Sequence, residues 1–280
     1  MELLGKAIPI AMLSFVVSSM LAVGLGLLLS QIAAPLRNVR LVAMGLATNF
    51  VLMPLAAVVL GRLLRLDTPF AVGLVILGSA AGAPFLPLLA KLSKGDMAFA
   101  VGLMVLLMIL SVGYMPLVLP LLLEGVSVDA MKIARSLLLL MLLPLGIGLV
   151  ARARWEPAAA RIKPVLDRVS SLSLILLIAL LTVTNFDKIV SVFGTRAILA
   201  GILFLLLGFA IGYVLGGPTR ETRRVLGLGT SQRNIAAALV VAGQNFSDPK
   251  VVVMVVVVAI VGLLLLMPLA RALARRASSA

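Results

Sequence analysis

Six consecutive glycine or polar residues interrupt the middle of the apolar segment 225–247, which is long enough to cross a membrane. A helix in lipid must satisfy its backbone hydrogen bonds internally, so such an interruption persists only inside protein or beside a cavity. Arg233 adds a permanent positive charge, and its planar guanidinium suits a carboxylate or a phosphate. Thr230, Gln232 and Asn234 add neutral hydrogen-bonding groups. These residue types favour the binding of an anion at mid-depth.

A second interruption lies in the apolar segment 68–90, where residues 78–84 are mostly small and Pro84 and Pro87 each remove a backbone donor. Half-helices that begin after such breaks present free N–H groups, which favour anions. An ordinary proline kink is the alternative for this break. For the break at residues 229–234, the alternative is that Arg233 only hydrogen-bonds carbonyls that the break exposes and so holds the structure together. The candidate substrate-binding residues are Arg233, Asn234, Gln232, Thr230, Pro84 and Pro87.

The two interruptions are related by their position and spacing. Gly82 precedes Asp96 by 14 residues, and Asn234 precedes Asp248 by 14 residues. Both aspartates are candidate helix N-caps, and Pro249 suits a first helical position. The interrupted segments are the third and the eighth apolar runs, so they cross the membrane in opposite directions. This predicts inverted repeats with two broken crossing helices, an arrangement found in secondary transporters.

Composition excludes several other classes of protein. The 280 residues are 62% hydrophobic and 12% charged, whereas a soluble domain has about 25% charged residues. The chain has no cysteine and no histidine, and its ten carboxylates lie in predicted loops or helix ends. This leaves no metal centre and no catalytic pair, so we expect no enzyme. The repeated broken helices favour alternating access over a channel. The net charge of +14 comes from residues at helix ends, which orient a membrane protein, so we expect no nucleic-acid partner.

The uncharged runs predict an all-α polytopic membrane protein formed as one unit of residues 1–280. Basic residues number fifteen on the side of the C-terminus and eight on the side of the N-terminus, with Arg233 between. This bias predicts a cytoplasmic C-terminus and an outer N-terminus, in a bacterial inner (plasma) membrane. The nine predicted helices are 8–30, 41–61, 68–90, 97–123, 136–151, 169–186, 197–219, 225–247 and 251–270.

Several stretches resemble the bile acid:sodium symporter family: residues 48–54, 73–78, 94–96 and 229–239. The resemblance implies a core domain (about 41–123 and 197–270) and a panel domain (about 8–30, 136–151 and 169–186), in a nine-helix variant that lacks the first helix of bacterial relatives. It implies a secondary active transporter of a small organic anion, embedded in the lipid bilayer and working by alternating access. Sodium is the possible coupling ion, and no other cofactor is implied.

The family's sodium ligands are only partly matched. The positions of the first sodium site carry Leu86, Pro87, Ala100, Met104 and Gly227, which offer no side-chain oxygen. The alternative is therefore a sodium-independent anion carrier or an efflux permease of the same fold. Arg233 would then grip the anion or act as a tethered cation where relatives bind sodium. The candidate ion-binding residues are Asn49, Thr48, Ser231 and Gln232, all neutral.

Overall fold

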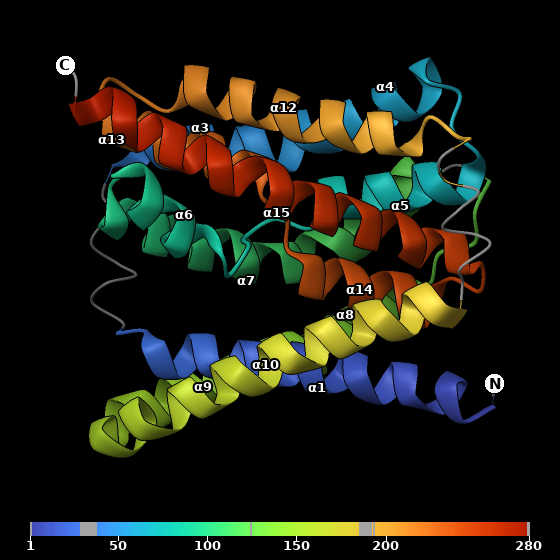
Figure 1. Ribbon diagram of the computed structural model, residues 1–280, viewed down its shortest axis with the longest axis horizontal. Coiled ribbons are helices and arrows are strands. Elements are labelled where there is room, and N and C mark those ends of the chain that lie inside the picture. Colours follow the sequence, from blue (N-terminus) through green and yellow to red (C-terminus); the bar gives the residue numbers. More distant parts are fainter. Residues whose placement is uncertain (1, 29–37, 124, 185–191, 193, 279–280) are drawn as a thin grey trace.

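In a computed structural model of the chain, residues 2–28, 38–123, 125–184, 192 and 194–278 are described. All regular structure within them is helical (Figure 1). The elements are α1 (Glu2–Gly26), α3 (Val39–Ala47), η2 (Thr48–Leu52), α4 (Met53–Leu63), α5 (Thr68–Ser79), α6 (Leu86–Ser93), α7 (Met97–Leu122), α8 (Ala130–Leu137), η3 (Leu138–Leu142), α9 (Leu143–Arg154), α10 (Glu156–Thr184), α12 (Ala197–Leu215), α13 (Arg220–Ser231), α14 (Ile235–Asn245) and α15 (Pro249–Ser278).

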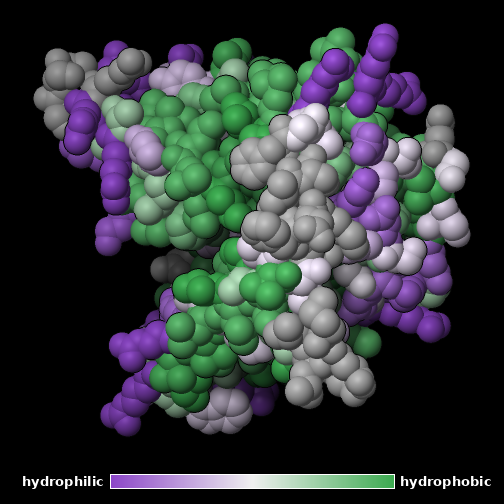
Figure 2. Space-filling model, turned by 45° about the vertical axis from the view of Figure 1, so that its right-hand side comes forward, coloured by the Kyte–Doolittle hydropathy of each residue, from purple (hydrophilic) through white to green (hydrophobic). Residues whose placement is uncertain are grey.

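Nine passes follow from these elements. Within the described residues, eight helical stretches are long and apolar enough to cross a membrane, and the short helices α5 and α6 together make another pass. Figure 2 shows apolar side chains over much of the surface, with hydrophilic side chains gathered towards the two ends. The protein is therefore an all-α polytopic membrane protein with two broken helices, as predicted.

Several predicted helix bounds were wrong: the first pass begins at Glu2, not at 8, and the eighth at Arg220, not at 225. The fifth pass begins at Ala130, not at 136, because Asp129 caps it by accepting a hydrogen bond from the backbone of Lys132. The sixth begins at Glu156, not at 169, and the last continues to Ser278, beyond 270. Charged residues had been taken as boundaries, but Lys163 and Asp167 form an i, i+4 ion pair within the first part of α10. The predicted ends at 30 and 186 lie outside the described residues.

The helices pack in two groups. Figure 1 shows α1, α9 and α10 lying together at the bottom, below the remaining long helices. α1 and α9 approach very closely at Gly24 and Gly148, where a Cβ on either residue would lie 2.9 Å from the Cα of the other. The fifth pass links the groups, since α8 packs on α7 and α14 whereas α9 packs on α1. The division into a core domain and a panel domain stays a prediction.

Buried apolar side chains form two clusters, separated by a polar layer. One cluster contains residues of α5 and α14, and the other contains residues of α6 and α13. Between them lie Asn49, Thr230, Arg233 and Asn234, all at most 2% exposed. A buried polar layer is tolerated only when its members bond one another. This layer contains the residues that the sequence singled out.

Candidate functional site

Both broken helices part at the polar layer. α5 ends at Ser79, and residues 80–85 run without regular structure to α6. Gly82 makes this path possible, because its φ is +79° and a Cβ there would lie 2.2 Å from the backbone nitrogen of Met108. α13 ends at Ser231, and α14 begins at Ile235. α5 packs on α14 and α6 packs on α13, so the four half-helices meet at one crossing (Figure 1).

Arg233 spans this crossing with four hydrogen bonds. Its Nε donates to the carbonyl of Leu77 at 2.9 Å, and its Nη2 donates to that of Gly78 at 2.6 Å. These carbonyls belong to the last turn of α5, where the break interrupts the helical hydrogen bonds. The carbonyl of Leu77 also accepts from the backbone nitrogen of Ala80 at 3.1 Å. Its Nη1 donates to Asn49 Oδ1 at 2.7 Å and to the carbonyl of Thr230 at 3.1 Å. Arg233 thus joins both breaks to the second pass.

Asn234 makes a second link across the crossing. Its backbone nitrogen donates to the carbonyl of Ala80 at 2.9 Å, and its Nδ2 donates to that of Gly82 at 3.2 Å. Its Oδ1 accepts from the backbone of Ala237 at 3.1 Å, which caps α14. One side chain therefore starts the second half-helix and satisfies the unwound chain of the first.

The guanidinium lies in an environment typical of a cation site. Its four acceptors are all neutral oxygens: three backbone carbonyls and the amide oxygen of Asn49. Unwound carbonyls and amide oxygens are also the ligands with which broken-helix transporters coordinate sodium. No carboxylate of the described residues makes an ion pair with Arg233. Within the described part of the chain, the partners of its charge are therefore dipoles alone.

The predicted ion-binding residues separate in the structure. Asn49 also donates to Thr48 Oγ1 at 3.2 Å and to Thr230 Oγ1 at 3.3 Å, so these three residues lie together. Ser231 instead donates to the carbonyl of Leu205 at 2.6 Å, on α12. Gln232 is half-buried, and its side chain has no hydrogen bond with another described residue.

The predicted substrate-binding residues differ in accessibility. Arg233, Asn234 and Thr230 are buried and bonded within the protein. Gln232, Pro84 and Pro87 are half-buried at the two breaks. A ligand that entered the crossing from solvent would therefore meet the Gln232 amide and the proline rings before the guanidinium.

Pro54 shapes the second pass and explains a contact that we did not predict. A proline removes its own N–H and displaces the carbonyl four residues before it, here that of Phe50. The turn around Phe50 is widened into the π-helical segment η2, which carries Thr48 and Asn49 to the crossing. The freed carbonyl of Phe50 accepts a hydrogen bond from the Tyr114 hydroxyl of α7. The signal in the sequence was the proline four residues after Phe50.

Two further polar residues that bond the broken helices were missed. The hydroxyl of Ser111 accepts from the backbone nitrogen of Ala81 at 3.0 Å and lies 3.1 Å from its carbonyl oxygen. A lone serine in an otherwise apolar helix was the available signal. Arg224, 4% exposed, donates to the carbonyl of Ser93 at 3.1 Å at the end of α6. Its place near a predicted helix end had suggested only a role in orientation.

Comparison with known proteins assigns the sequence to a family. The model of the Sodium Bile acid symporter family matches residues 12–192. This chain belongs to that family. It is 28% identical over 255 residues to the probable sodium/metabolite cotransporter BASS3, chloroplastic, of Arabidopsis thaliana. The aligned region covers 88% of this chain and 59% of that relative. It is 25% identical over 245 residues to BASS6 of the same plant, covering 83% and 60%. The chain thus spans about 60% of the length of these relatives.

Within this sodium bile acid symporter family member, the positions implied for a first sodium site are apolar. Leu86, Ala100 and Met104 are at most 2% exposed and belong to the cluster between α6, α7 and α13. Leu86 also packs against Gly229, whose Cβ would lie 2.9 Å from it. The space around these residues is filled by carbon atoms, which cannot coordinate sodium.

Proposed function

We propose that this protein is a secondary transporter of a small organic anion in which Arg233 takes the place of a coupling cation. One observation carries the proposal: the guanidinium is held by four neutral oxygens that come from both broken helices and the second pass. A coupling ion would stabilise the same crossing, but it would bind and dissociate in each transport cycle. Arg233 is covalently attached, so the crossing is complete without sodium at this position.

The charge of Arg233 also favours an anionic substrate. A buried charge that dipoles alone balance attracts a counter-charge in its low-dielectric surroundings. Four hydrogen bonds leave the guanidinium little capacity for direct contact, so the anion lies beside it. The Gln232 amide and the surfaces of Pro84 and Pro87 provide the contact, and they are the half-buried groups at the crossing.

Sodium coupling is the second candidate, and Ser79 is the observation in its favour. The hydroxyl of Ser79 is buried at the end of α5 and has no hydrogen-bond partner among the described residues. A buried polar atom without a partner is uncommon. It could act as a sodium ligand next to the carbonyls that Arg233 occupies, as the names of the plant relatives suggest.

A thermal-stability experiment separates these candidates. The purified protein is heated in detergent with sodium chloride or choline chloride at equal ionic strength. A ligand that binds only the folded state stabilises it in a saturable way. We expect no sodium-specific shift for the wild-type protein, and a saturable sodium-specific shift for Arg233→Ala, in which the four oxygens are free. Millimolar methylguanidinium chloride should also raise the midpoint of this variant.

Arg224→Ala is the matched control, because Arg224 is a second buried arginine that donates to carbonyls of a broken helix. It should lose stability without gaining a response to sodium. A saturable sodium shift in the wild-type protein would instead support sodium coupling. An Arg233→Ala variant that responds to methylguanidinium but not to sodium would reduce Arg233 to a structural role.

The family supports a protein that is not an enzyme, and the helices show that it is integral to a membrane. We further propose that it lies in a bacterial plasma membrane with its C-terminus in the cytoplasm. The excess of basic residues at the end of the molecule that carries the C-terminus supports this orientation.

A further inference from the structure

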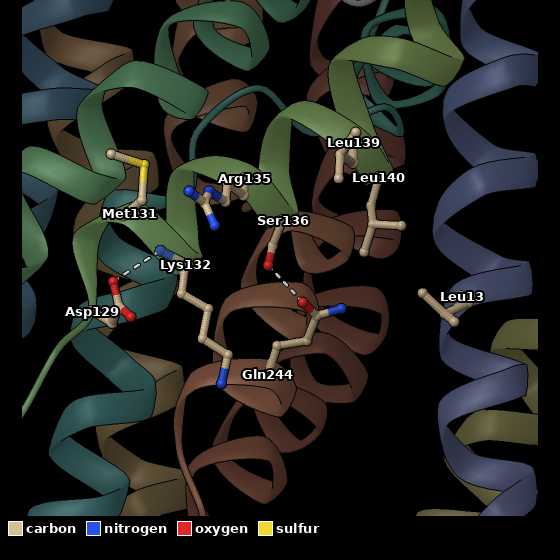
Figure 3. Close-up of a pocket in the computed structure, with 9 residues that line it drawn as sticks. All are labelled: Leu13, Asp129, Met131, Lys132, Arg135, Ser136, Leu139, Leu140 and Gln244. Atoms are coloured by element: carbon tan, nitrogen blue, oxygen red, sulfur yellow. Dashed lines mark hydrogen bonds between the residues drawn. The ribbon is translucent and has the colours of Figure 1, made fainter.

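A hollow of about 400 Å³ lies between α1, α8 and α14 at the end of the molecule that carries the N-terminus, here called the N-terminal face (Figure 3). Polar groups line one part of it: Asp129, Lys132, Arg135, Ser136 and Gln244. Leucines and a methionine line the rest. Figure 3 shows Leu13 of α1 opposite Gln244 of α14, so the hollow opens between the two groups of helices.

The two cations of this hollow have no internal partner. Neither the ammonium of Lys132 nor the guanidinium of Arg135 forms an ion pair or a hydrogen bond with another described residue. Other basic residues of the N-terminal face do: Lys250 lies 3.7 Å from Asp67, and Arg196 donates to the carbonyl of Leu64. The proposed orientation in the membrane does not explain Lys132 and Arg135 either. Basic residues gather on the cytoplasmic face, which is the opposite face of the molecule.

The acidic residue of the hollow is already engaged. Asp129 Oδ1 accepts from the backbone nitrogen of Lys132 at 2.9 Å, at the positive end of the α8 dipole. A carboxylate held there stabilises the positive end of the helix dipole more than it neutralises the charges of Lys132 and Arg135. The lining therefore has two cations against one acid, and its field favours an anion.

Gln244 supplies a directed donor. Ser136 donates to Gln244 Oε1 at 2.6 Å, which fixes the amide so that its nitrogen points away from Ser136, as Figure 3 shows. An amide nitrogen and two cations suit a carboxylate, which has about four acceptor sites. Leu13, Leu139 and Leu140 can then cover an apolar body attached to it.

We propose that this hollow is a second anion-binding site, a vestibule that holds a small organic carboxylate with an apolar body. In addition, we expect the transported substrate to bind here before it reaches the crossing, and this role rests on the proposed function. α14 joins the two sites, because it begins at the crossing beside Asn234 and ends at Gln244. At 1.5 Å per residue the vestibule lies about 15 Å from the crossing.

The absence of cysteine from the chain gives a direct test. Leu139→Cys places one thiol in the lining, where Leu139 is 61% exposed. Its reaction rates are measured in the purified protein with anionic sulfonatoethyl methanethiosulfonate and with neutral methyl methanethiosulfonate. Adding Lys132→Gln and Arg135→Gln should lower the ratio of the anionic to the neutral rate roughly fivefold. Adding Arg62→Gln and Arg65→Gln, the same charge change elsewhere on this face, should leave the ratio unchanged.

Potassium hexanoate then probes binding. It should slow the anionic reagent at Leu139→Cys in a saturable way, whereas hexanol and potassium chloride at equal ionic strength should not. A cysteine at Ser127, exposed on the same face but outside the lining, should receive no protection.

The vestibule is overturned by an unchanged ratio in the charge variant. It is also overturned if hexanoate protects neither cysteine, or both equally, or if neither reagent reaches residue 139. The assay involves neither sodium nor transport, and Arg233 is intact in it. Its failure would therefore leave the proposed carrier standing, and the failure of the Arg233 experiment would leave the vestibule standing.

Discussion

At the scale of single residues, the crossing is held by side-chain and backbone donors that bond carbonyls at the two helix breaks and at the proline-containing second pass. Arg233 serves Leu77 and Gly78, Asn234 serves Gly82, and Tyr114 serves Phe50. A buried carbonyl left without a donor costs about 1–3 kcal/mol, so each donor contributes more by preventing that loss than by its own hydrogen bond.

Tyr114→Phe tests this view, because it removes only the hydroxyl. We expect the free energy of unfolding to fall by about 1–3 kcal/mol, since the carbonyl of Phe50 is left without a partner. The measurement is equilibrium unfolding in mixed micelles of mild detergent and sodium dodecyl sulfate. Tyr213→Phe is the matched control: its hydroxyl has no hydrogen bond to another described residue, and its ring packs on Phe209. Equal effects of the two substitutions would contradict the assignment.

At the scale of elements, the first broken helix depends on one glycine. The unwound chain of residues 80–85 passes so close to α7 that Gly82 has no room for a side chain, and it also adopts a positive φ. Ser111 of α7 bonds the next residue back, Ala81, which fixes the chain at this contact. α7 is therefore the surface against which the break is shaped.

Gly82→Ala should consequently be among the most damaging single substitutions. The added Cβ would meet the backbone of Met108, and the positive φ strains any residue other than glycine, so we expect a loss of more than about 3 kcal/mol or a failure to fold. Thermal unfolding and the yield of monodisperse protein report this. Gly113→Ala on α7 is the control, because nothing lies within 4 Å of the added Cβ, and it should change stability by less than about 1 kcal/mol. A stable Gly82→Ala protein would contradict this, because it would show that residues 80–85 can adopt another path past α7.

The sequence allowed the passes and both breaks to be predicted, because long apolar runs and their polar or proline interruptions are strong local signals. The start of α10 could not be predicted from charge, since charged residues such as Lys163 and Asp167 pair along the helix and remain helical. The polar residues of the crossing, such as Arg233 and Asn234, could be named by type and position, while their role in binding stays a prediction. Their partners at Leu77 and Gly78 could not, because these act through backbone carbonyls, which carry no side-chain signal in the sequence.

At the scale of the whole molecule, the two groups of helices meet along α14, which begins at the crossing and ends at the vestibule. α1 touches the other group through α14, while α8 and α9 join the two groups in one continuous pass. The π-helical turn η3 and Pro144 lie at the middle of that pass. Such irregular turns are places where a helix can bend, so a rocking motion of one group against the other is the movement that we expect.

Alternating access makes a prediction about Gln232, the half-buried polar residue of the crossing. In oriented membrane vesicles, a membrane-impermeant thiol reagent should reach Gln232→Cys from both sides, because each face opens in turn. Asn38→Cys, at the exposed start of α3, should react from one side only, which also reports the orientation of the chain. Labelling of residue 232 from a single side under all conditions would argue against alternation.

The location of Arg233 late in the chain has a consequence for biosynthesis. The pass that carries it, α13 with α14, is the least apolar of the eight candidate spans, yet it is the most buried of them. An arginine at the centre of a lone helix costs about 2.5–3.5 kcal/mol to insert. Asn49, Leu77 and Gly78 all precede Arg233 in the sequence, so the ribosome delivers its partners to the membrane first. The first half of the protein thus acts as an assembly template that receives a segment poorly suited to enter lipid alone.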